Sequence, residues 1–136
     1  MPANIWRKIQ SFYNLKGTKC TACSSLFFPA EQVCMSCGLE KMEMHEFSGT
    51  GKITTFTVIR QQFNDDGERT QLVLPNPYTI AIIELDEGPM ITAQIADANQ
   101  DEIEIGQRVH AVFRKISEQG AEGIIKYGYK FIIENK

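Results

Sequence analysis

The chain has 136 residues, 43% of them hydrophobic, and a formal net charge of −3 at pH 7. This length suits one domain, or a small domain with an accessory module, built around a buried core. No apolar run approaches the roughly 20 residues that a membrane span needs, and the N-terminus lacks the apolar core of a secretion signal, so we expect a cytoplasmic protein. The slight acidity argues against a protein whose main task is to grip nucleic acid.

Residues 4–16 have the periodicity of an amphipathic helix. Asn4 is suited to cap its start, and Gly17 is a stop signal. The apolar stripe, at intervals of three and four with Trp6 beside it, consists of Ile5, Ile9, Phe12 and Tyr13. This face either packs on the core of the domain or docks on a partner protein.

The four cysteines fall within eighteen residues, in the pattern Cys20-x2-Cys23-x10-Cys34-x2-Cys37. Two residues between ligands let one tight turn present both sulfurs to a single ion, and the ten-residue spacer lets a hairpin bring the two turns together. Gly38 follows the second pair, at a position that often needs a positive φ, whereas Ser24 holds the matching place. We therefore predict a structural zinc ribbon with Cys20, Cys23, Cys34 and Cys37 as its ligands.

Other uses of these cysteines fit less well. Disulfides are rare in reducing compartments, and a thioredoxin-like pair would need a single CxxC in a βαβ unit. Four thiolates close the coordination sphere, which argues against catalytic zinc. A rubredoxin-type iron site uses the same ligands and stays open as an alternative.

From residue 47 onward the pattern changes to strands. Runs of β-branched, aromatic and alternating residues predict five strands, at 52–60, 78–85, 90–95, 108–115 and 124–133. Residues 61–76, between the first two strands, are expected to form a turn or loop that contains a short edge strand at 71–74. Residues 98–102 are expected to form a polar connection with a helical turn. The predicted fold is mainly β: an N-terminal amphipathic helix (1–17), a rubredoxin-like zinc ribbon (18–46) and a five-stranded antiparallel OB-fold barrel (47–136).

This order of modules, with a set of short segments, resembles an acyl-CoA-associated family that joins a rubredoxin-like zinc ribbon to an OB fold. The segments are Cys20-Thr21-Ala22-Cys23 with Phe28-Pro29, Cys34-Met35-Ser36-Cys37-Gly38, the stretch from Phe47 to Val58, Pro77-Tyr78, the stretch from Ile83 to Pro89, and that from Ile105 to Val109. They span nearly the whole chain in the expected order.

The resemblance implies a non-catalytic subunit that works beside thiolase-fold enzymes, or beside hydratases that act on acyl-CoA. The short chain is similar to the archaeal form that bridges acetoacetyl-CoA thiolase and hydroxymethylglutaryl-CoA synthase. The resemblance therefore implies a scaffold of the mevalonate (isoprenoid) pathway. This scaffold would hold the two enzymes together, retain acetoacetyl-CoA and help bind CoA shared with the enzymes.

The residues themselves do not predict catalysis. His45 and His110 are the only histidines, no cysteine is left over as a nucleophile, and the chain has no phosphate loop or nucleophile elbow. Candidates for contact with the CoA phosphates are Arg7, Lys8, Lys19 and Arg60, although side chains of this kind are more often solvated surface charges. The alternatives are a nucleic-acid-binding OB-fold and zinc-ribbon protein, in which Tyr127 and Tyr129 would stack on bases, and a rubredoxin-like electron carrier.

Overall fold

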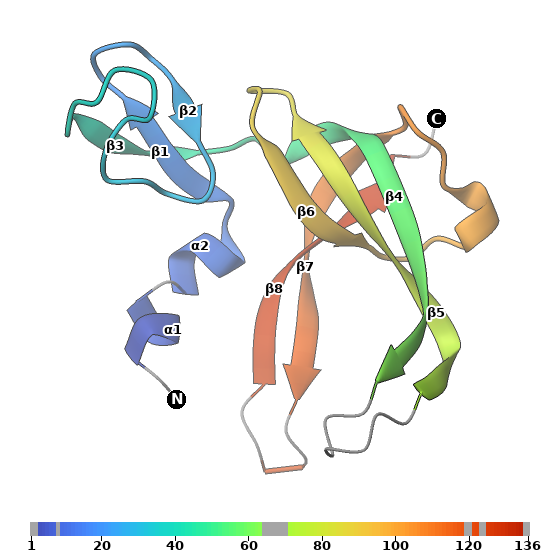
Figure 1. Ribbon diagram of the computed structural model, residues 1–136. Coiled ribbons are helices and arrows are strands. Elements are labelled where there is room, and N and C mark those ends of the chain that lie inside the picture. The colour runs from blue at the N-terminus through green and yellow to red at the C-terminus, as the bar shows by residue number, and fades with distance from the viewer. Residues whose placement is uncertain (1–2, 8, 64–70, 119–120, 123–124, 135–136) are drawn as a thin grey trace.

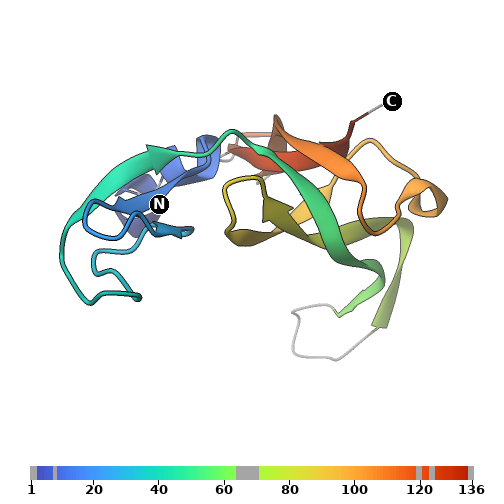
Figure 2. The same cartoon turned by 90° about the horizontal axis from the view of Figure 1, so that it is seen from above.

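The computed structural model describes residues 3–7, 9–63, 71–118, 121–122 and 125–134. It consists of a small three-stranded sheet and a closed five-stranded barrel that lie side by side (Figures 1 and 2). The chain passes between them once, from strand β3 (Met42–Glu46) to strand β4 (Thr50–Phe63). The two modules expected from the sequence are therefore both present.

The N-terminal segment differs from the expected single helix over 4–16. It forms two short helices, α1 (Ala3–Arg7) and α2 (Ile9–Tyr13), and strand β1 (Lys16–Cys20) begins before the predicted stop at Gly17. Helices of one turn have little stability of their own, so α2 depends on its packing against β1 and strand β8 (Ile125–Ile133). None of the described helices is long and apolar enough to cross a bilayer.

The three-stranded sheet has β1 at its centre. This strand pairs antiparallel with β2 (Leu26–Phe27) on one side and with β3 on the other, giving the order β2-β1-β3. Gly17 is required at this position, because a Cβ there would lie 2.1 Å from the carbonyl oxygen of Phe27. The buried Thr18 accepts a hydrogen bond at its Oγ1 from the backbone N–H of Glu31 (3.0 Å), which ties the spacer between the cysteine pairs to the sheet.

The barrel has the strand order β4-β5-β6-β8-β7, with β7 pairing back onto β4. Its further strands are β5 (Gln71–Leu85), β6 (Met90–Ile95) and β7 (Arg108–Glu118). The five-stranded OB-like barrel is confirmed, but one pairing is parallel, between β6 and β8 at Ile95 and Phe131. The parallel pair follows from the topology: β7 runs antiparallel to β4, so β8, antiparallel to β7, runs in the direction of β6.

The strands lie at the predicted positions but differ at their ends: β4 extends past both predicted ends, β5 begins earlier, β7 ends later, and β6 has the predicted bounds. β4 and β5 continue as a paired ribbon through Gln61 and Val73, so the loop expected over 61–76 is shorter, and its predicted edge strand is the start of β5. Residues 64–70, within the expected loop, lie outside the described residues. The helical turn expected in 98–102 is confirmed as the 3-10 helix η1 (Gln100–Glu102).

A hydrophobic core fills the barrel and reaches the ribbon. Its most buried side chains, which alternate along their strands, are Ile53, Ile83, Leu85, Val109 and Phe131. Leu15 and Phe47, which flank the ribbon sheet, belong to the same cluster. The ring of Phe28 from the ribbon lies edge-on to Phe47, with centroids 5.9 Å apart, so apolar contacts seat the ribbon on the barrel.

Candidate functional site

The four predicted zinc ligands converge on one point at the end of the ribbon. Their Sγ atoms all lie within 4.8 Å of one another, and the separations are 3.6 Å for Cys20 and Cys37 and 3.4 Å for Cys23 and Cys34. Four sulfurs about 2.3 Å from a tetrahedral zinc ion would lie about 3.8 Å apart. The arrangement therefore fits a four-thiolate metal site after small adjustments.

Matching backbone turns present the two cysteine pairs. In each turn the carbonyl of the first cysteine accepts a hydrogen bond from the residue four positions on, from Ser24 to Cys20 (2.9 Å) and from Gly38 to Cys34 (2.8 Å). Both donors have positive φ, 63° at Ser24 and 74° at Gly38. The turn thus imposes the same left-handed conformation on both residues, and only the glycine adopts it without steric cost.

The thiols have the electrostatics of a site that needs a cation. Hydrogen bonds from Ser25 lower the pKa of Cys23 to about 6. A backbone hydrogen bond with Leu39 lowers the pKa of Cys37, but the sulfur of Cys34, desolvation by burial and the other two sulfurs together outweigh it and raise this pKa to about 12. Four clustered thiols cannot all ionise by themselves, and a dication would remove this repulsion. With four protein sulfurs the coordination sphere has no place for a reacting water, so the metal's role is structural.

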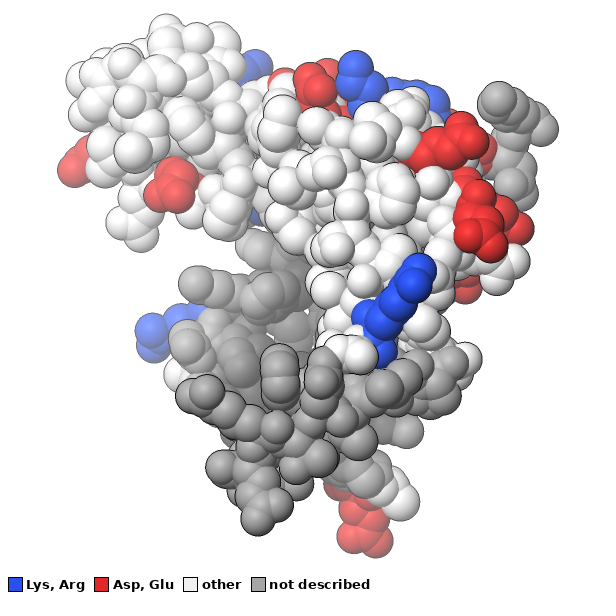
Figure 3. All heavy atoms as spheres, turned by 45° about the vertical axis from the view of Figure 1, so that its right-hand side comes forward, with Lys and Arg blue, Asp and Glu red and all other residues white. Residues whose placement is uncertain are grey.

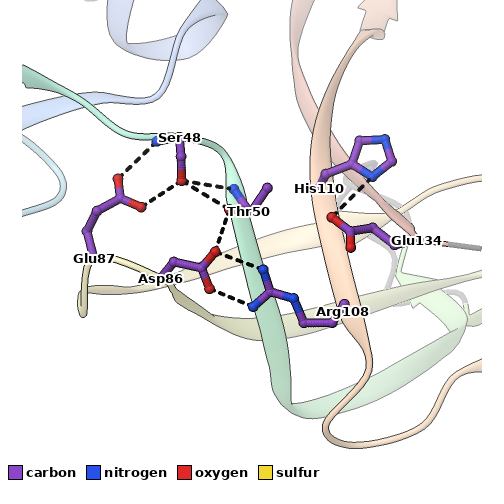
Figure 4. Close-up of polar contacts among 7 residues, drawn as sticks. All are labelled: Ser48, Thr50, Asp86, Glu87, Arg108, His110 and Glu134. Carbon is purple, nitrogen blue, oxygen red and sulfur yellow. Dashed lines mark hydrogen bonds and ion pairs between the residues drawn. The ribbon is translucent and has the colours of Figure 1, made fainter. Parts of the chain in front are cut away.

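A polar network joins the linker that follows the ribbon to the barrel (Figure 4). The N–H and the hydroxyl of Ser48, in the linker, donate to the carboxylate of Glu87 at 2.9 and 2.7 Å. The hydroxyl of Thr50 donates to Asp86, and Arg108 binds the same carboxylate through two nitrogens, at 2.6 and 2.8 Å. The linker, the β5–β6 turn and the start of β7 are thereby held together.

The guanidinium of Arg108 and the hydroxyl of Thr50 hold the pKa of Asp86 well below its usual range. The same contact raises the pKa of Arg108. Sequence reasoning missed this network, because its partners lie 22 to 39 positions apart in the chain.

The two histidines lie in separate contacts. His45 packs edge-on against Phe47, with its Nε2 3.9 Å from a carboxylate oxygen of Glu87. His110 lies on β7, with its Nδ1 3.9 Å from a carboxylate oxygen of Glu134. Neither contact has the geometry of a nucleophile and its base.

The candidate CoA contacts are not brought together. Arg7 is exposed on α1, Lys19 lies in the ribbon, and Arg60 lies on β4, where it donates to the side chain of Gln100 at 3.0 Å. Helix α1 and the end of β4 lie on opposite sides of the molecule in Figure 1, and Lys8 lies outside the described residues. Acidic side chains gather on the barrel near η1 (Figure 3). The described cations therefore form no joint phosphate site.

Comparison with known proteins places both modules. Residues 13–43 match the rubredoxin-like zinc ribbon domain of ChsH2, and residues 44–114 match its C-terminal OB-fold domain. The chain is 43% identical over 130 residues to a protein of Methanothermobacter thermautotrophicus named DUF35 domain-containing scaffold protein, covering 93% of this chain and 91% of the relative. The chain belongs to the DUF35 family. This confirms the family resemblance found in the sequence.

Other relatives agree on the family and the fold. A DUF35 scaffold protein of Methanocaldococcus jannaschii is 41% identical, over 96% of this chain and 89% of its own. The solved structure of the Ltp2-ChsH2(DUF35) aldolase has a chain with a TM-score of 0.70 at 24% identity, covering 96% of this chain and 92% of that one, which supports the fold. The relatives' names support a non-catalytic scaffold, the coarse part of the function expected.

Proposed function

We propose that this DUF35 protein is a non-catalytic scaffold that holds an acetoacetyl-CoA thiolase and a hydroxymethylglutaryl-CoA synthase together in the cytoplasm. The observation that carries the proposal is that archaeal relatives, matched over about nine tenths of their length, are named scaffold proteins. Two features of the chain support a non-catalytic role. Its metal site is closed by four sulfurs, and the carboxylates of Asp86 and Glu87 are engaged in internal contacts.

The advantage of such a scaffold would lie in the acyl-CoA intermediate. The family resemblance implies that thiolase forms acetoacetyl-CoA unfavourably unless the next enzyme consumes it, so proximity of the two enzymes would draw the reaction forward. A relative in Thermomonospora curvata, 30% identical over 91 residues and about four times as long as the matched part, is named probable enoyl-CoA hydratase alpha subunit. This name supports an acyl-CoA setting for the family.

The contribution to CoA binding would be made at the enzyme interfaces. Arg7, Lys19 and Arg60 lie on three different elements, α1, β1 and β4, so each would contact a CoA held mainly by an enzyme. We propose that the division into residues 1–17, a ribbon at 18–46 and a barrel at 47–136 serves the assembly, with the metal-bound ribbon and the barrel presenting separate surfaces.

The test is reconstitution from three purified chains of the same organism. Size-exclusion chromatography with light scattering should show the thiolase and the synthase in one particle only when the scaffold is present. In that particle, less acetoacetyl-CoA should reach bulk solution than from the two enzymes alone. Co-elution of the enzymes without the scaffold, or elution of the scaffold by itself, would contradict the proposal.

A further inference from the structure

Four aromatic side chains gather where α2 meets β7 and β8. The ring of Tyr13 lies edge-on to Phe113, with centroids 5.3 Å apart, and Phe113 stacks on Tyr127 at 5.3 Å with 12° between the ring planes. Phe113 is paired in register with Tyr129, and Tyr127 is two residues along β8 from Tyr129, so these three residues share one face of the hairpin. We call Tyr13, Phe113, Tyr127 and Tyr129 the aromatic face.

The aromatic face continues the core side of the hairpin beyond the barrel. Ala111 and Phe131, the next pair on the same side of the hairpin, belong to the side that packs into the core, and Phe131 is fully buried. Further along, the β7–β8 hairpin projects below the barrel (Figure 1). On this part of the hairpin Phe113 is 52% exposed and Tyr127 38%, and Tyr13, which packs against Phe113 from α2, is 36% exposed. The register thus presents core-type residues to solvent, which in a soluble domain indicates an interaction surface.

A pocket of about 150 Å³ opens beside this face, between α2, the ribbon–barrel linker and β7. Tyr13, Phe113, Tyr129 and Phe47 are among the residues that line it. Pockets for drug-sized ligands and cofactors begin at about 300 Å³. The pocket is therefore too small for a nucleotide or CoA, and of a size to receive one large side chain of another protein.

The surroundings disfavour a polyanion on the aromatic face. Among the described residues, the cation on this side of the hairpin is Lys115, in register with Tyr127. Arg114 lies on the opposite side of β7 and pairs with Asp97 at 2.9 Å. A polyanion needs several clustered cations. Phe113 and Tyr127 stack on each other, whereas a base-stacking platform offers each ring to a separate base. The occupant is accordingly an apolar protein surface rather than a nucleic acid or a CoA phosphate chain.

The exposed area of the aromatic face bears on whether its partner is a second copy of this chain or a different protein. At roughly 200 Å² for a whole aromatic side chain, the three exposed fractions leave about 250 Å². An obligate homodimer buries at least about 1,000 Å² of each chain, whereas the central cluster of a standard interface is a fraction of about 800 Å². The area fits the centre of a contact between different proteins.

We propose that the aromatic face is the central contact with one of the two enzymes, which places an apolar side chain in the pocket beside Tyr13 and Phe113. This inference rests on the proposed scaffold function and names the surface that performs it. Buried aromatic anchors dominate the binding energy of such interfaces, so removing two of them has a large effect.

The experiment measures binding of the full, zinc-loaded scaffold to purified thiolase and to purified synthase by isothermal titration calorimetry. The double variant F113A/Y127A is expected to bind one enzyme about 30-fold more weakly or worse. The matched control is I82A/I105A, which removes two apolar side chains, 38% and 68% exposed, from elsewhere on the surface and is expected to bind like the wild type. If the double alanine variant unfolds at a lower temperature than the wild type, Y127K replaces it. This single change places a charge in the aromatic face and should give the same loss of affinity.

The outcomes separate the inference from the proposed function. If the wild type binds the enzymes and the aromatic variants bind both with unchanged affinity, the face is not the contact, although the scaffold function stands. If the wild type binds neither enzyme, the function and the inference both fail. If light scattering shows a wild-type dimer that the variants lose, a second copy occupies the face and the inference is wrong.

Discussion

Ser24 occupies a backbone conformation that its counterpart Gly38 adopts without cost. Left-handed φ costs a non-glycine residue about 1–2 kcal/mol, and glycine loses about 0.5–1 kcal/mol more entropy on folding. We therefore expect S24G to raise the free energy of unfolding of the zinc-loaded protein by about 0.5–1 kcal/mol, as measured by urea titration. The control A22G, in the same turn at a residue without positive φ, should lower it. A loss of stability in both variants would contradict this account of the turn.

Cys34 is one of two fully buried ligands, so its loss cannot be replaced by water without opening the ribbon. We expect C34S to lose the metal and complex formation, while the partner enzymes keep their own activities. Elemental analysis and co-elution with the enzymes measure these effects. The adjacent M35S, at a side chain 79% exposed, is the control and should retain both metal and assembly. Normal assembly of C34S without metal would show that the site has no structural role.

The pair of Asp86 and Arg108 should make stability depend on pH. The pKa of Asp86 is lowered in the folded protein, so the pair stabilises the fold above the unfolded value of about 4, and this contribution is lost as the pH falls through the folded pKa. We expect D86N to be less stable than the wild type at pH 7, with the difference shrinking below about pH 4.

Comparing D86N and the wild type at each pH by denaturant unfolding cancels the titration of the cysteines, which both proteins share. D101N, an exposed change in η1, serves as the control and should leave stability nearly unchanged. A difference between D86N and the wild type that stays constant from pH 7 to pH 3 would mean that the carboxylate's charge plays no part.

At the scale of elements, the features that the sequence predicted are those set by residues close together in the chain. Alternation located the five barrel strands, and ligand spacing identified the four cysteines, because both signals lie within a few residues. The helix over 4–16 was wrong, since pairing of Lys16 with Glu46 of β3 draws the end of that segment into the ribbon sheet. The contacts of Asp86 with Thr50 and Arg108 join residues 36 and 22 positions apart, which periodicity cannot reveal.

The close approach of β4 and β5 depends on Gly51. A Cβ at this position would lie 2.4 Å from the carbonyl oxygen of Glu84 and 2.9 Å from a methyl carbon of Ile83. We expect G51A to push the strands apart and lower the free energy of unfolding by about 1–3 kcal/mol, measured by urea titration. K52A, the neighbouring exposed residue, should have a much smaller effect. Equal stability of G51A and the wild type would mean that this contact relaxes freely.

At the scale of the molecule, the two modules depend on different sources of stability. The barrel has its own core, in which Ile53, Ile83, Val109 and Phe131 are almost fully buried. In the ribbon sheet and its cysteine turns, the described residues that are fully buried are Cys20 and Cys34, so the metal takes the place of a core there. Leu15 and Phe47 join the ribbon to the barrel, but they lie at its base.

Removing the metal should therefore unfold one module and leave the other folded. After chelation, we expect amide hydrogen exchange to accelerate throughout β1, β2 and β3, while β4 to β8 keep their protection. The untreated protein and a chelated sample with zinc restored are the controls, and restoring zinc should recover the protection of the ribbon. Loss of protection throughout the barrel would instead show that the contacts of Phe47 and the Ser48–Glu87 network make the two modules a single cooperative unit.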